Sequence, residues 1–217
     1  MKVELIAMTQ YLGGDGTPEA LIERAARVCY RSESRGNPAA FLRARLRDGH
    51  ESIVEHASAT FEISGISRAC SHQLVRHRLA SYSQESQRYV DMSDPDLVVP
   101  DAIEASPEAS EVWSSFVEQV KDVYSELRGL GIPREDARFA LPNAAETRIV
   151  MTMNFRELRH FFRLRLAPEA QWEIRRVALE MLKQLAPHAL TVFGEILAEF
   201  EEKYPSFYSD MERRYDC

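Results

Sequence analysis

The sequence has few cysteines and no long apolar run, and both absences exclude whole classes of protein. Its three cysteines, Cys29, Cys70 and Cys217, are odd in number and lack CxxC spacing, so neither a disulfide framework nor a zinc site is indicated. No stretch reaches the roughly 18 to 20 uninterrupted apolar residues of a membrane helix. The N-terminal segment MKVELIAMTQYLGGDG lacks the features of a signal peptide. We therefore expect a cytoplasmic protein without a bound metal and without a membrane partner.

An excess of positive charge is also missing. Lysine and arginine total 27 against 34 acidic residues, which gives a formal net charge of −7. An acidic chain repels a polyphosphate backbone at long range, so we expect no nucleic-acid partner. A small anion can still be bound where positive charge is concentrated locally.

Hydrophobic periodicity predicts a helix-rich α/β chain with few strands. The expected strands are residues 3–8, 57–64 and 147–154. The expected helices are residues 18–30, 38–49, 66–75, 107–129, 133–141, 154–166, 170–186 and 187–203. Three prolines predict a loop over residues 93–107. There is no repeat and no long linker, so we expect a single domain spanning residues 1–217.

Arginine and serine cluster between residues 76 and 88, which read RHRLASYSQESQR. A guanidinium offers a planar fork of donors that suits phosphate, and serine hydroxyls add neutral donors beside it. A solvated helix end making surface salt bridges is the alternative, and composition alone leaves the two nearly balanced. The serines slightly favour phosphate binding, because a solvated helical face would more often carry lysine and glutamate.

Histidine and glutamate crowd together in GHESIVEH, residues 49–56. The spacing argues against a metal site, because His50 and His56 are six residues apart, whereas a zinc-binding helix needs histidines four apart. The alternative to a ligand-binding role is a turn whose histidines satisfy backbone groups.

The segment NFRELRHFFRLR, residues 154–165, is predicted to form an amphipathic helix. One face carries Arg156, Arg159, His160 and Arg163. Arg165 falls among the apolar residues, where a permanent charge is costly without an anionic partner. Either the helix ends before Arg165, as Pro168 allows, or Arg165 points into a ligand pocket.

The cluster at residues 76–88 spells RHRxxSxxxxSxR, which resembles the signature of the flavin-dependent thymidylate synthases (the ThyX family). Six fixed positions coincide by chance on the order of 10⁻⁸ per starting residue. Further segments resemble the family in order and spacing: GHESIVEH (49–56), HQLVRHR (72–78), IPREDARFALP (132–142), NFRELRHFFRLR (154–165) and AQWEIR (170–175). The similarity covers roughly residues 1 to 200.

The resemblance implies an FAD-dependent enzyme that converts dUMP to dTMP. The one-carbon unit would come from 5,10-methylenetetrahydrofolate and the reducing equivalents from NADPH, through FAD. It also implies a ThyX-like fold, an α+β domain with a small, mostly antiparallel sheet. The expected assembly is a homotetramer whose active sites are shared between subunits.

The resemblance also assigns site residues. The dUMP set is Gln73, Leu74, Val75, Arg76, Gln84, Glu85, Ser86, Gln87, Arg88, Arg138 and Arg165. The FAD set is Ser52, Arg76, His77, Arg78, Gln84, Asn154, Phe155, Arg156 and His160. Arg165 is the expected catalytic residue, because a guanidinium beside the uracil ring favours its N3-ionised form. A surface pair with Glu135 is the alternative role for Arg138.

Three further predictions concern Gln84, Cys70 and the class of protein. Gln84 stands where many family members have Glu, which keeps hydrogen-bonding reach and removes a charge. Cys70 has apolar neighbours, so we assign it to the core rather than to nucleophilic catalysis. A non-catalytic nucleotide- or RNA-binding module could use the same arginines, but the acidic composition disfavours it.

Overall fold

The computed structural model describes residues 1–33 and 36–207, and these residues form two compact units. The first unit contains Met1–Lys2, Ile63–Arg76 and Ser83–Ile149. The second contains Val3–Glu62, His77–Tyr82 and the chain from Val150 onward. The predicted single domain over residues 1–217 stays a prediction. Residues 208–217, with Cys217, lie outside the described part.

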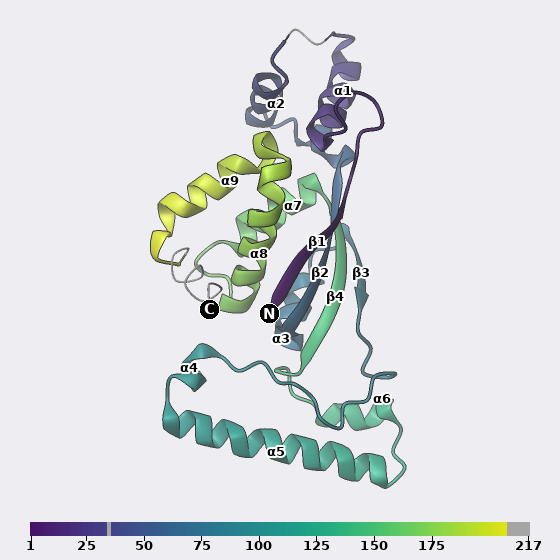
Figure 1. The fold of residues 1–217 in the computed structure, drawn as a ribbon, viewed down its shortest axis with the longest axis vertical. Coiled ribbons are helices and arrows are strands. Elements are labelled where there is room, and N and C mark those ends of the chain that lie inside the picture. Colours follow the sequence, from purple (N-terminus) through teal and green to yellow (C-terminus); the bar gives the residue numbers. More distant parts are fainter. Residues whose placement is uncertain (34–35, 208–217) are drawn as a thin grey trace. The chain divides into compact units, whose positions relative to one another are not determined.

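Within the described ranges, four strands form one antiparallel sheet in the order β1-β2-β4-β3 (Figure 1). They are β1 (Lys2–Met8), β2 (Ser58–Ser67), β3 (Ala80–Gln84) and β4 (Glu146–Asn154). Three of these match the predicted strands to within a few residues. The fourth, β3, was missed because its sequence ASYSQ has no apolar alternation, so only its pairing with β4 makes it a strand.

One face of the sheet is buried. Along β2 the buried side chains include Phe61 and Ile63, and along β4 they include Ile149, Met151 and Met153. Buried and partly exposed positions alternate along both strands, as expected where one face packs on a core. The helix-rich α+β class predicted from the sequence is therefore confirmed.

The second unit is built from helices around an aromatic core. Its helical elements are α1 (Pro18–Tyr30), α2 (Pro38–Arg47), η1 (Glu51–His56), α7 (Phe155–Arg165), α8 (Trp172–Leu185), η3 (Ala186–His188) and α9 (Leu190–Lys203). Helix α7 packs on η1, α8 and α9. The rings of Phe155 and Phe162 both pack edge-on against Phe193, with centroids 4.9 and 5.8 Å away.

A side chain from α8 supports the edge strand β1 within this unit. The Gln184 Oε1 atom accepts a hydrogen bond from the Leu5 backbone N–H at 2.8 Å, and its Nε2 donates to the Val3 carbonyl at 2.8 Å. An edge strand otherwise exposes unpaired backbone groups, and this amide satisfies two of them.

The first unit contains α3 (Arg68–Leu74), α4 (Asp101–Glu104), α5 (Pro107–Gly129), α6 (Arg134–Ala137) and the 3₁₀ turn η2 (Arg138–Ala140). Helix α5 has the predicted bounds, since Ser106 caps its N-terminus and Pro107 occupies the first turn. It contributes Tyr124 to a small core with Met92 and Ala137. The predicted loop over residues 93–107 contains the short helix α4, which was not predicted because three prolines in this segment indicated a loop.

None of the helices in the described ranges is both long enough and apolar enough to cross a membrane. Cys29 is exposed and Cys70 is buried, and no disulfide joins these two cysteines.

Candidate functional site

The residues predicted to bind ligands fall into two groups, one in each unit. The first unit holds Gln73, Leu74, Val75, Arg76, Gln84, Glu85, Ser86, Gln87, Arg88 and Arg138. The second holds Ser52, His77, Arg78, Asn154, Phe155, Arg156, His160 and Arg165. The division falls inside the RHR motif, between Arg76 and His77.

A pocket of about 260 Å³ in the first unit brings two arginines together. Arg68, Gln87 and Arg138 are among its lining residues. Burial lowers the pKa of Arg68, and the like charge of Arg138 lowers it further. The Nε2 atom of Gln87 is a buried donor without a hydrogen-bond partner among the described residues. Two guanidinium groups and an unused donor make this pocket suited to an anion.

Arg138 is not held by the carboxylate of Glu135. Its Nε atom donates to the Glu135 backbone carbonyl at 3.1 Å. The carboxylate instead pairs with Arg88, whose Nε and Nη2 atoms lie 3.0 and 2.9 Å from Oε2. The alternative role for Arg138, a surface ion pair with Glu135, is therefore wrong. Arg88 is the arginine that forms that exposed pair.

The position of Gln84 explains why an amide stands there. Its Nε2 atom donates to the Ser71 hydroxyl at 2.9 Å and to the Thr147 hydroxyl at 3.2 Å. The Ser71 hydroxyl already donates its own hydrogen to the Arg68 carbonyl at 3.0 Å. Ser71 therefore needs a donor as its next partner, which Gln supplies and an ionised Glu does not.

A buried hydrogen-bonded chain lies at the centre of the second unit's group. The Nδ1 atom of His77 lies 3.0 Å from the Oε1 atom of Glu157, and Arg165 Nε donates to His77 Nε2 at 3.0 Å. Burial lowers the pKa of His77. The Tyr82 hydroxyl donates to the His77 backbone carbonyl at 2.9 Å, and burial raises the pKa of this phenol.

Helix α7 ends at Arg165, which lies in its last turn and is half-buried. Of the two possibilities drawn from the sequence, the first is wrong, because the helix does not end before Arg165. One hydrogen-bond partner of Arg165 is the imidazole of His77, whose Nε2 atom accepts from Arg165 Nε at 3.0 Å.

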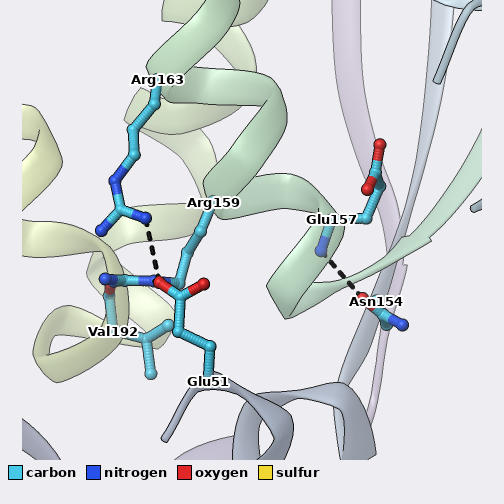
Figure 2. Close-up of polar contacts among 6 residues, drawn as sticks. All are labelled: Glu51, Asn154, Glu157, Arg159, Arg163 and Val192. Atoms are coloured by element: carbon cyan, nitrogen blue, oxygen red, sulfur yellow. Dashed lines mark hydrogen bonds and ion pairs between the residues drawn. The ribbon is translucent and has the colours of Figure 1, made fainter. Parts of the chain in front are cut away.

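Glu51 anchors the opposite side of α7 (Figure 2). Its Oε1 atom accepts from Arg163 Nη1 at 2.9 Å and from Arg159 Nε at 3.4 Å. Arg159 also donates to the Val192 carbonyl and is 2% exposed. Burial would raise the pKa of Glu51, but the hydrogen bond and charge of Arg163, with those of Arg159, hold it below its ordinary value. The basic face predicted for this helix is thus partly buried.

The 3₁₀ helix η1 presents Glu51 to α7. It follows Gly49, whose φ of +80° ends α2 in the left-handed region that glycine adopts most easily. His50 and His56 are both exposed, at the two ends of η1. The segment GHESIVEH therefore supplies anionic partners for arginines, with Glu51 on Arg159 and Arg163 and Glu55 on Arg156.

The remaining predicted FAD residues differ in exposure. Ser52, Arg78, Arg156 and His160 are exposed. Asn154 caps α7, because its Oδ1 atom accepts from the Glu157 N–H at 2.9 Å (Figure 2). Phe155 is fully buried, as is Leu74 in the first unit.

His77, Glu157 and His160 also present ligand atoms within 4.8 Å of one another. Both ring nitrogens of His77 are already engaged, by Glu157 and Arg165. The expectation that the protein binds no metal stays a prediction.

Sequence reasoning missed three residues that organise these groups: Arg68, Glu51 and Glu157. Arg68 begins α3, where the helix dipole disfavours a cation, and that mismatch was a usable signal. Glu157 carries a carboxylate on the side of α7 that holds Phe161, which marks it as a buried polar position. No local signal indicated Glu51, since its partners lie more than a hundred residues away.

Two arginines that line one pocket of an α+β chain, and a buried histidine bonded to a third arginine, are features suited to a small anionic ligand. Residues 5–189 match the family model for thymidylate synthase complementing protein, and the chain belongs to this family. The chain is 48% identical over 206 residues to a flavin-dependent thymidylate synthase from Geobacter sulfurreducens, covering 90% of this chain and 86% of that protein. It is 42% identical over 223 residues to one from Mycobacterium marinum, covering 90% and 89%. The family membership expected from the RHR motif is confirmed.

Proposed function

We propose that this protein is an FAD-dependent thymidylate synthase that methylates dUMP to dTMP. The observation that carries the proposal is the similarity, over 90% of the chain, to proteins named flavin-dependent thymidylate synthase. The one-carbon donor is 5,10-methylenetetrahydrofolate, and NADPH is the proposed reductant. The nucleic-acid-binding alternative has no comparable support.

The residues present fit the proposed ligands. In the first unit, Arg68, Arg138 and the buried Nε2 of Gln87, which has no partner among the described residues, offer donors of the kind that a nucleotide phosphate accepts. In the second unit, the exposed hydroxyl of Ser52 and the exposed guanidinium of Arg78 suit the diphosphate of a dinucleotide. FAD, when bound, supplies the capacity to carry a hydride.

The chain's own residues bind the ligands and orient them. Arg165 is proposed to lie beside the uracil ring and to stabilise negative charge at N3, as a fixed guanidinium can in a site shielded from water. Its Nε–H is already held by His77, so the side chain is oriented before substrate arrives. Arg88 would contact dUMP either while it keeps its exposed ion pair with Glu135 or after that ion pair breaks.

Several finer features remain part of the proposal. They are the ThyX-like fold, a single domain over residues 1–217, a cytoplasmic location, and a homotetramer with active sites shared between subunits.

The test combines a spectrum with an omission assay. The purified protein is expected to be yellow, with a flavin absorption band, and to form dTMP from dUMP only when FAD, NADPH and methylenetetrahydrofolate are all supplied. Omitting each component in turn provides the controls. A colourless protein that forms no dTMP in the complete mixture, or forms it without flavin, would overturn the proposal.

A further inference from the structure

Glu157 is a buried acid on the helix that ends at Arg165, and family resemblance gives it no role. It is 8% exposed, and its Oε1 atom lies 3.0 Å from the Nδ1 atom of His77. His77 is 5% exposed, and its other nitrogen accepts from Arg165 Nε at 3.0 Å. Figure 2 shows Glu157 directed away from the Glu51–Arg163 pair, on another side of α7. The three side chains therefore form a continuous chain of hydrogen bonds.

The chain is compatible with one protonation state of His77. Arg165 Nε–H can only donate, so His77 Nε2 must present a lone pair. The proton of the neutral ring then sits on Nδ1, where it is donated to the Glu157 carboxylate. A tautomer protonated on Nε2, or a doubly protonated ring, would set one donor against another at Arg165.

We propose that Glu157 is a positioning residue for the reaction, acting through the tautomer of His77 to fix the guanidinium of Arg165. The inference rests on the proposed function, because it assigns Glu157 to the orientation of the residue proposed to activate the pyrimidine. It gives His77 a role toward Arg165 in addition to its proposed contact with FAD.

The imidazole between the two charged groups has a physical advantage. A carboxylate bonded directly to Arg165 would hold the guanidinium but would also neutralise much of its charge. Coulombic interaction falls with distance, so placing Glu157 one ring further away weakens that neutralisation while preserving the hydrogen-bonded geometry. Glu157 therefore orients Arg165 while offsetting less of its positive charge than a carboxylate in direct contact would.

Other groups that face His77 leave this assignment intact. The His160 ring lies 5.7 Å from the His77 ring, and the Phe161 ring lies 5.0 Å away edge-on. The Tyr82 hydroxyl donates to the His77 backbone carbonyl. The acid within hydrogen-bonding reach of the ring, among the residues described, is Glu157.

The first experiment replaces Glu157 by Met, which keeps volume and helix propensity and removes the acceptor. In the complete protein with FAD, we expect kcat for dTMP formation to fall on the order of 100-fold, with FAD affinity little changed. Glu157→Gln retains an acceptor oxygen and is expected to recover a substantial part of the rate. Glu23→Gln is the matched control, because Glu23 is 9% exposed and pairs with Arg27 in α1. This control is expected to lower stability without lowering kcat.

The second experiment tests whether Glu157 acts through Arg165. The residual kcat of Arg165→Ala should be the same, within about threefold, with and without Glu157→Met, because coupled residues give non-additive effects. A full additional loss in the double variant, or normal kcat in Glu157→Met, would overturn the proposal.

A spectroscopic readout keeps the inference testable apart from turnover. With ¹⁵N-labelled histidine, the His77 signals, assigned by their loss in His77→Gln, should report the Nδ1–H tautomer at neutral pH. An Nε2–H tautomer or an imidazolium in the unsubstituted protein would overturn the inference, even if Glu157→Met failed to fold. A protein that makes no dTMP would refute the proposed function, whereas the histidine spectrum would still decide the Glu157–His77 arrangement.

Discussion

Replacing Glu51 by Gln should measurably destabilise the protein, because it removes the anion that faces a buried arginine. In the folded chain, Glu51 Oε1 is 2.9 Å from Arg163 Nη1 and 3.4 Å from Arg159 Nε. Arg159 is 2% exposed, so its charge cannot be solvated when the carboxylate is gone. The amide of Gln keeps an acceptor oxygen but not the negative charge.

The expected cost follows from the burial of the partners. Breaking a fully buried ion pair costs about 3–5 kcal/mol, whereas an exposed pair contributes about 0–1 kcal/mol. The Glu51 side chain is 27% exposed, and Arg159 keeps its bond to the Val192 carbonyl, so we expect an intermediate loss of about 2 kcal/mol. For a chain of this size, that corresponds to a decrease in Tm of about 4–8 °C.

The dependence on pH gives the same prediction a second signature. The pKa of Glu51 is lowered by folding, so its stabilising contribution is present above the ordinary value of 4.5 and is lost as the pH falls through the lowered value. The difference in Tm between the original protein and Glu51→Gln should be largest at neutral pH, where the Glu51 carboxylate is ionised. It should shrink progressively below about pH 4.5.

Calorimetric melting of matched variants supplies the assay. Glu55→Gln is the control, because Glu55 pairs with Arg156 where both side chains are about half exposed. The Tm of Glu55→Gln should equal that of the original protein. An unchanged Tm for Glu51→Gln, or equal losses for the two variants, would refute the reasoning that burial of Arg159 sets the cost.

Three other substitutions test separate parts of the structure. Arg165→Ala is expected to keep bound FAD, seen by absorbance, and to lose dTMP turnover; normal turnover would contradict the role given to Arg165. Gln84→Glu should lower the free energy of unfolding in urea by about 1–3 kcal/mol, because the Ser71 hydroxyl needs a donor there; an unchanged midpoint would show that the Ser71 hydroxyl reorients freely. Cys70→Ala should retain dTMP formation, because Cys70 is fully buried in the core; complete loss of activity in a folded variant would identify it as a nucleophile after all.

Most helices and strands of the fold could be predicted from the sequence. Helix α5 has the predicted bounds because Ser106 and Pro107 specify its start and apolar side chains recur at helical spacing. Strands β2 and β4 were found because their buried side chains alternate. Strand β3 was not, since a polar segment becomes a strand only when a neighbour supplies the hydrogen bonds.

By itself, the sequence determined the family, through a motif whose residues are adjacent in the chain, and it singled out Arg165 as a charge in an apolar setting. Only the tertiary structure decided how those residues are held. In the structure, Arg165 donates a hydrogen bond to a histidine 88 positions away, and Glu135 forms an ion pair with Arg88 rather than with Arg138. Glu51 forms ion pairs with two arginines of α7. Periodicity reports which face of an element is apolar, whereas the partner of a charge depends on which elements meet, and that is fixed by packing of the whole chain.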